Sequence, residues 1–159
     1  MIANIQLREL INKLDDCQMN KVTIEINKIN KLFNPIFVSV YDCVLLHEKE
    51  PEALAKSYER AIELHRTPNA YEVFCSDTRI NDFFENQLTA LEALSIGLLT
   101  IDIWGKRLKA IDEKANYCII LDCNDGYVTI RYHKVRDNEN RWLADDIEDY
   151  DGPIGYIIV

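Results

Sequence analysis

The stretch YCIILDCNDGYVTIRYHKV, residues 117–135, decides the fold. Two runs rich in β-branched and aromatic residues, 117–123 and 127–135, flank Asn124-Asp125-Gly126. Glycine adopts the positive φ that a tight turn requires, so the stretch predicts a β-hairpin. Side chains alternate between the two faces of a strand, which gives the second strand one apolar and one polar face. The apolar face carries Val128, Ile130 and Tyr132, and the polar face carries Thr129, Arg131 and His133.

A stripe of apolar residues at helical spacing precedes the hairpin. The stripe consists of Ile80, Phe83, Phe84, Gln87, Leu88, Leu91, Leu94, Leu98, Ile101, Trp104, Leu108 and Ile111. Ser76, Asp77 or Thr78 offers an oxygen that would cap the first turn. The spacing fits one long helix, or two helices broken near Gly97. We interpret the stripe as core packing against the hairpin; a groove for a cofactor or partner helix, or an oligomer contact, is the alternative.

The chain after the hairpin ends in another apolar run. Residues 154–159 follow Asp151-Gly152-Pro153 and predict a final strand. Together these segments predict an α+β fold in which N-terminal and central helices pack on a C-terminal antiparallel β-meander.

The N-terminal half gives weaker patterns. Residues 2–14 have helical spacing, residues 22–33 fit either a strand or a helix, and residues 36–46 predict a buried strand. A helix is expected from Pro51 to His65, ended by Thr67-Pro68-Asn69, with a short strand at 71–75. We find no repeat or linker, and 159 residues suit a single domain over 1–159.

The chain shows no targeting or membrane segment. Charged residues interrupt the first sixteen positions, so no signal peptide is expected, and residues 93–101 are too few to span a bilayer. The five cysteines form an odd and scattered set: Cys17, Cys43, Cys75, Cys118 and Cys123. A secreted disulfide framework would more often show an even count. These features predict reduced thiols and a cytoplasmic protein.

Motifs for catalysis, cofactors and metals are missing. The sequence has no glycine-rich nucleotide loop and no nucleophile elbow, and Cys118 and Cys123 would face opposite sides of a strand. We therefore predict no catalytic residues, no cofactor and no metal. The alternative is a small enzyme or ligand-binding domain, with a cleft between the long helix and the sheet around Arg131 and His133. Nucleic acid is disfavoured as a partner, because the net charge is −9 and the basic residues at 106–109 lie among acids.

The negative charge is concentrated near the C-terminus. Residues 135–159 hold 2 basic and 7 acidic side chains, a net charge of −5, against −4 for all residues before them. Within this stretch, carboxylates alternate with aromatic residues, which together can anchor and steer a basic protein partner. The predicted docking surface consists of Trp142, Asp145, Asp146, Glu148, Asp149, Tyr150 and Asp151. An ordinary acidic loop, with Trp142 and Tyr150 packed inward, is the simpler interpretation.

In its size, its charge and this acidic-aromatic segment ahead of Gly152-Pro153-Ile154-Gly155-Tyr156, the chain resembles the small acidic immunity proteins of bacterial toxin–immunity systems. The resemblance implies a non-enzymatic inhibitor that binds a cognate toxin domain, often a basic nuclease, and occludes its active site. It implies no particular site residues and no oligomeric state.

Overall fold

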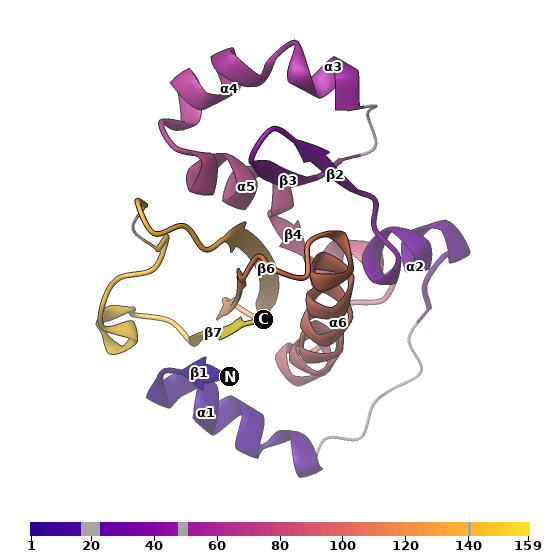
Figure 1. The fold of residues 1–159 in the computed structure, drawn as a ribbon. Helices are drawn as coiled ribbons and strands as arrows, with labels where there is room; N and C mark the ends of the chain where they lie inside the picture. Colours follow the sequence, from indigo (N-terminus) through magenta and orange to yellow (C-terminus); the bar gives the residue numbers. More distant parts are fainter. Residues whose placement is uncertain (17–22, 48–50, 140) are drawn as a thin grey trace.

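A five-stranded antiparallel sheet organises the molecule, which we describe from a computed structural model for residues 1–16, 23–47, 51–139 and 141–159. The strand order is β1-β7-β5-β6-β4. The strands are β1 (Ile2–Ala3), β4 (Thr78–Arg79), β5 (Tyr117–Asn124), β6 (Tyr127–Lys134) and β7 (Ile154–Ile158). The structure thus confirms the predicted α+β class and the antiparallel C-terminal strands (Figure 1).

The hairpin of β5 and β6 forms as predicted. Asn124 pairs with Tyr127, which leaves Asp125 and Gly126 as a two-residue turn, with φ of 51° and 80°. Positive φ at both positions is typical of the turn whose twist matches that of the flanking strands. Val128, Ile130 and Tyr132 are buried against the long helix, also as predicted.

The strand order differs from a sequential meander because β7 pairs with β5 instead of β6. The outer edge of β6 is already occupied. Its backbone N–H groups at Val128 and Tyr132 donate to the side chains of Asn81 (3.0 Å) and Ser76 (2.9 Å), and β4 pairs between them. The last strand therefore completes the sheet along the free edge of β5.

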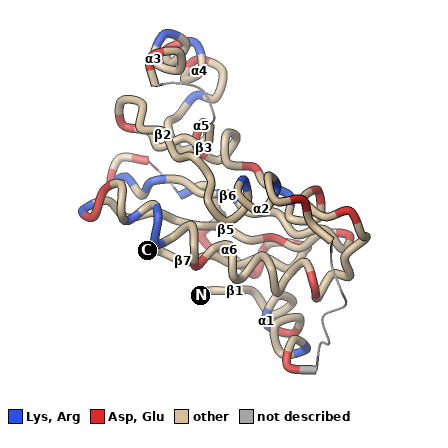
Figure 2. Tube along the Cα trace, turned by 90° about the vertical axis from the view of Figure 1, so that its right-hand side faces the viewer, with Lys and Arg blue, Asp and Glu red and all other residues tan. Residues whose placement is uncertain are grey.

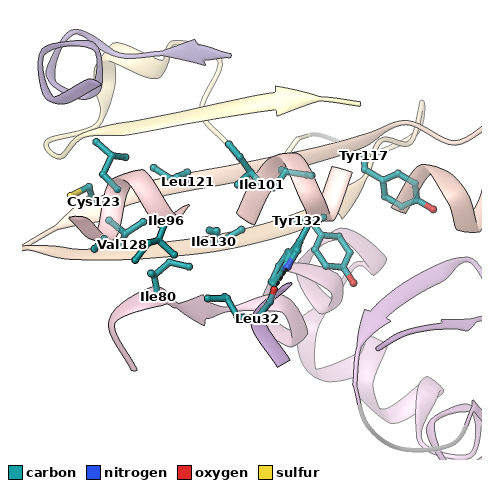
Figure 3. Close-up of a cluster of buried hydrophobic side chains, with 14 of the residues drawn as sticks. Leu32, Ile80, Ile96, Ile101, Tyr117, Leu121, Cys123, Val128, Ile130 and Tyr132 are labelled. Atoms are coloured by element: carbon teal, nitrogen blue, oxygen red, sulfur yellow. Dashed lines mark hydrogen bonds between the residues drawn. The ribbon is translucent and has the colours of Figure 1, made fainter. Parts of the chain in front are cut away.

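Helix α6 (Ala90–Ile111) covers one face of the sheet. Figure 3 shows Ile96 and Ile101 of α6 packed over Leu121, Val128 and Ile130 of the hairpin. The helix is continuous through Gly97, so the break considered there does not occur.

The start of α6 lies further along the chain than the stripe predicts. Residues 80–83 form a 3₁₀ turn, and the helix begins only after Thr89. Thr89 and Glu92 cap each other's backbone N–H groups reciprocally, an arrangement that fixes a helix N-terminus.

The N-terminal half contains more breaks than the sequence indicates. The predicted first helix is α1 (Ile5–Asn12), and α2 (Ile26–Phe33) settles the ambiguous segment as helical from Ile26; residues 17–22 lie outside the described part. The single strand expected at 36–46 is a hairpin of β2 (Phe37–Val40) and β3 (Cys43–Leu46), turning at Tyr41. The helix expected from Pro51 to His65 is divided into α3 (Pro51–Ala55) and α4 (Tyr58–His65).

The strand predicted at Tyr71–Cys75 is wrong, because these residues lie in helix α5 (Pro68–Ser76). Thr67 caps its first turn by accepting from the N–H of Ala70 (3.1 Å), and Pro68 occupies the first helical position. Thr67-Pro68-Asn69 therefore begins a helix as well as ending the preceding one.

Two further packing regions lie outside the main core. The β2–β3 hairpin packs with α3, α4 and α5 around Val40, Leu45 and Tyr71, and this lobe lies at the top of Figure 1. Residues 141–153 lie over the sheet face opposite α6, where Leu143 and Ile147 pack on Cys118 and Ile120. Both faces of the sheet are thus covered.

Candidate functional site

The acidic segment is held in place by its own apolar side chains. Leu143, Ile147 and Tyr150 pack toward the sheet. The Tyr150 hydroxyl also accepts a hydrogen bond from the N–H of Ala144 (2.9 Å), which closes the segment on itself. Tyr150 is thus partly buried, as the simpler interpretation expected of it, and serves to order the segment.

All five predicted carboxylates are exposed: Asp145, Asp146, Glu148, Asp149 and Asp151. Two of them have local structural roles. Asp146 accepts from the N–H of Glu148 (2.9 Å), and Glu148 pairs with Arg8 of α1 (3.0 Å). Asp145, Asp149 and Asp151 form no ion pair with any residue that the structure describes, so their charges face solvent.

Trp142 lines a pocket that none of these carboxylates lines. Its side chain is 52% exposed, and the pocket, of about 670 Å³, is formed with α4 and α5. Leu64 and Phe74 line the same pocket and are 76% and 67% exposed. The structure therefore divides the predicted docking surface into an acidic stretch and an apolar pocket. Figure 2 shows acidic and basic residues dispersed along the trace, without a continuous basic track across the described residues in that view.

Sequence reasoning did not find Leu64 and Phe74. The sequence predicts a strand at residues 71–75, and a strand there gives no reason for Phe74 to lie beside α4. In the structure, the His65 ring stacks on Tyr71 (5.4 Å between centroids) and contacts Phe74 (4.5 Å). Rings at these separations attract each other, which holds the end of α4 against α5.

A buried ion pair, Glu72 of α5 with Arg136, joins the lobe to the sheet. The Glu72 side chain is fully buried, and the Arg136 side chain is 7% exposed. The two Glu72 carboxylate oxygens accept from the backbone N–H groups of Val44 (2.9 Å) and Lys134 (2.8 Å), at the edges of β3 and β6. The Arg136 guanidinium donates to both oxygens (2.8 and 3.2 Å). Glu72 is thus a bridge between the two sheets.

Burial raises the pKa of the Glu72 carboxyl, and Arg136 with the two backbone donors opposes that rise. Burial also disfavours the charged form of Arg136, but Glu72 and Asp42 raise the pKa of Arg136 above its ordinary value. For Asp42, burial is outweighed by Arg136 and Lys134, which together lower its pKa. Because the hydrogen bonds of Glu72 run to backbone and guanidinium donors, we assign this cluster a structural role.

Helix α6 lies directly on the sheet at Gly97, within the region proposed for an enzyme cleft. A Cβ atom added at Gly97 of α6 would lie 2.8 Å from Val128, so the helix rests directly on the sheet. Arg131 points to the other face, where it pairs with Asp77 (2.9 Å) and with Asp122. Arg131 and His133 lie on the strand face opposite α6, so neither side chain lies between that helix and the sheet.

His133 is buried, and both of its ring nitrogens are engaged. Nδ1 lies 2.9 Å from the carbonyl oxygen of Lys134, and Nε2 accepts from the N–H of Trp142 (3.5 Å). A neutral ring with the proton on Nδ1 satisfies both contacts. Burial lowers the pKa of His133 below its ordinary 6.5; Arg136 and Arg141 also lower it, against the Lys134 carbonyl and Glu139.

We expect this buried histidine to make the fold acid-sensitive. Below pH 6.5, His133 binds a proton in the unfolded chain but not in the folded one, so stability falls as the pH drops toward the folded pKa. One such group changes the free energy of unfolding by at most about 1.4 kcal/mol per pH unit. Urea unfolding at pH 5.0–7.5 should show this slope, and His133→Gln should reduce it. An equal slope in the variant, or an imidazolium signal from folded His133 at pH 6.5 in NMR, would contradict the assignment.

The described cysteines, Cys43, Cys75, Cys118 and Cys123, are free thiols, whereas Cys17 lies outside the described residues. Burial raises the pKa of Cys43 to about 11 and that of Cys118 to about 12, which disfavours the reactive thiolate. Cys118 and Cys123 pack on opposite faces of the sheet, as their parity predicts. No cluster of potential metal ligands occurs among the described residues.

The protein has an α+β fold, with a long helix on one face of an antiparallel sheet and an acidic segment on the other. The chain belongs to the uncharacterized protein PM0498 family, which matches residues 3–158. No curated protein and no solved structure matches the chain. No helix in the described residues is both long and apolar enough to cross a bilayer.

Proposed function

We propose that this protein is an immunity-type inhibitor that binds a basic protein, a cognate bacterial toxin domain, and occludes its active site. One observation carries the proposal: carboxylates face solvent from a segment that is anchored to the sheet, next to a half-exposed tryptophan. An ordered acidic surface can attract a basic partner without the entropy loss of folding a tail on binding.

The two parts of the surface would have different tasks. Asp145, Asp149 and Asp151 supply a field that accelerates encounter with a basic surface and weakens as salt screens it. Trp142 supplies apolar contact area of the kind that dominates binding energy at interfaces. A nuclease is a suitable toxin, since its phosphate-binding surface is basic and complementary to these carboxylates. We place this inhibition in the bacterial cytoplasm, where buried thiols such as Cys118 stay reduced.

The test begins with the chain tagged in its native host, and the copurifying protein is identified and then prepared pure. The association rate constant and the dissociation constant of the complex are measured at 50 and 300 mM salt. We expect Asp145→Asn/Asp149→Asn/Asp151→Asn to slow association at least tenfold at low salt, and Trp142→Ala to weaken binding about thirtyfold or more, as hot-spot residues do.

A matched control removes three exposed carboxylates elsewhere. Glu52→Gln/Glu59→Gln/Glu113→Gln makes the same change in net charge on α3, α4 and the turn after α6. It should retain more than half of the association rate of the native chain. If the two triple variants slowed association equally, the effect would come from net charge and not from the acidic segment. If Trp142→Ala left the affinity unchanged, the interface would lie elsewhere.

A further inference from the structure

The pocket beside Trp142 has the shape and lining of a small ligand site. Its volume of about 670 Å³ lies in the range that small molecules occupy in proteins. Ala70 and Val73 of α5 contribute small apolar side chains, while Leu64, Phe74 and Trp142 present the large ones. Leu64 and Phe74 come from the consecutive helices α4 and α5 and Trp142 from the C-terminal segment, and each is more than half exposed. An exposed apolar cluster of this kind is typical of a binding site.

One charged residue that lines the pocket forms no ion pair with any described residue. Arg66, Arg131 and Asp77 are the residues with full charges in the lining. Arg131 pairs with Asp77 and also with Asp122, which does not line the pocket. Arg66 forms no ion pair with any residue in the described part of the chain. Arg66 is therefore the arginine of this lining that could pair with an anionic ligand.

The backbone at Arg66 provides an independent indication. Arg66 follows the last residue of α4 with φ 71° and ψ −34°, a region that side chains other than glycine rarely adopt. Glycine is the common residue at such helix ends. An arginine could interact with the C-terminus of the helix without this conformation. Strain of this kind is concentrated at ligand-binding and active sites.

We propose that this pocket binds a ligand that joins an apolar group to a carboxylate, with the apolar group against Phe74, Leu64 and Trp142 and the carboxylate facing Arg66. A single carboxylate matches Arg66, the arginine of this lining that forms no ion pair with a described residue. The ligand chemistry has two sources, a free small-molecule acid or the C-terminal carboxylate of a peptide that ends in an apolar residue. This site does not depend on the proposed inhibition of a toxin, although both involve Trp142.

The probes separate charge from shape. 3-Phenylpropionate, its amide and 3-phenylpropylamine have similar size but carry a negative, no and a positive charge. Each is titrated to 10 mM while NMR follows the two indole N–H signals. Trp104, whose indole donates to the carbonyl of Leu32 (2.8 Å) in the core, is the internal control. We expect the acid to shift the Trp142 signal with a dissociation constant of about 1 mM or below, and the amide and amine to bind at least tenfold more weakly.

A second arm distinguishes the two sources. Acetyl-Ala-Ala-Phe with a free carboxylate is compared with its C-terminal amide. Tighter binding of this peptide than of 3-phenylpropionate assigns the site to a peptide terminus, and the reverse assigns it to a small molecule; both outcomes support the pocket. If neither acid moves the Trp142 signal, or if acid and amide bind equally, the proposal is wrong.

Arg66 variants test the site without destroying the fold. Arg66→Gly removes the charge and suits the positive φ, so it should abolish the preference for the acid while the Tm stays unchanged or rises. Arg66→Lys keeps a cation and should retain binding within about fivefold. Undiminished binding of the acid by Arg66→Gly overturns the proposal. A lowered Tm in Arg66→Gly would also overturn it, because the side chain would then be needed for folding.

Discussion

Replacing Arg136 with methionine is expected to lower the free energy of unfolding by about 3–5 kcal/mol. The substitution leaves the Glu72 carboxylate fully buried and without its cation. Burial already raises the pKa of Glu72, and loss of Arg136 removes the main opposing influence. Protonated Glu72 would keep the charge out of the core, but one of its oxygens would then become a donor facing a backbone N–H. Urea unfolding at pH 7 measures the effect.

Two companion variants show whether the loss comes from an unpaired charge. Arg136→Met/Glu72→Gln removes both charges and should be less destabilised than the sum of the two single variants. Arg60→Met, at an exposed position on α4, removes an arginine from the surface and should change stability by less than about 0.5 kcal/mol. A loss below 1 kcal/mol in Arg136→Met would show that the bridge between the sheets does not depend on the pair.

The bridge explains why strand order could not be predicted from the sequence while the hairpin could. The hairpin depends on alternation and on a turn at Asp125-Gly126, all within nineteen residues. Strand order depends on which chain segment occupies the outer edge of β6. Backbone N–H groups of β6 donate to the side chains of Ser76, Asn81 and Glu72. No sequence pattern indicates that a serine, an asparagine or a glutamate in a helix or loop will accept such a hydrogen bond.

The same distinction applies to the candidate site. The exposure of Asp145, Asp149 and Asp151 follows from composition, because isolated carboxylates rarely enter a core. The pocket beside Trp142 required the positions of α4 and α5, and a helical α5 depends on the cap at Thr67 more than on the β-branched and aromatic content of residues 71–75. The strand propensity of these residues was outweighed by the helix cap, so the sequence could not predict where Phe74 lies.

Gly97→Val is expected to destabilise the fold by about 3 kcal/mol, although valine has a higher helix propensity than glycine. Helix α6 contains two glycines, Gly97 and Gly105. A Cβ atom added at Gly97 would lie closer to its nearest neighbour than one added at Gly105. A Cβ atom at Gly97 would lie 2.8 Å from a methyl group of Val128 and 3.1 Å from one of Leu121. Val128 is fully buried and β-branched, so it has little freedom to move aside. Thermal and urea unfolding should agree in the size of the loss.

The clash with Val128 makes a rescue possible. Truncation by Val128→Ala removes the nearest methyl group, so it should destabilise the native chain but recover part of the loss in Gly97→Val, giving a coupling energy of about 1 kcal/mol or more between the two positions. Leu99→Val, at a half-exposed position on the same helix, controls for β-branching and should lose about 0.5 kcal/mol. If the effects at positions 97 and 128 simply add, close contact is not the reason for the glycine, and the helix must be held on the sheet by packing at Trp104 and Leu108 instead.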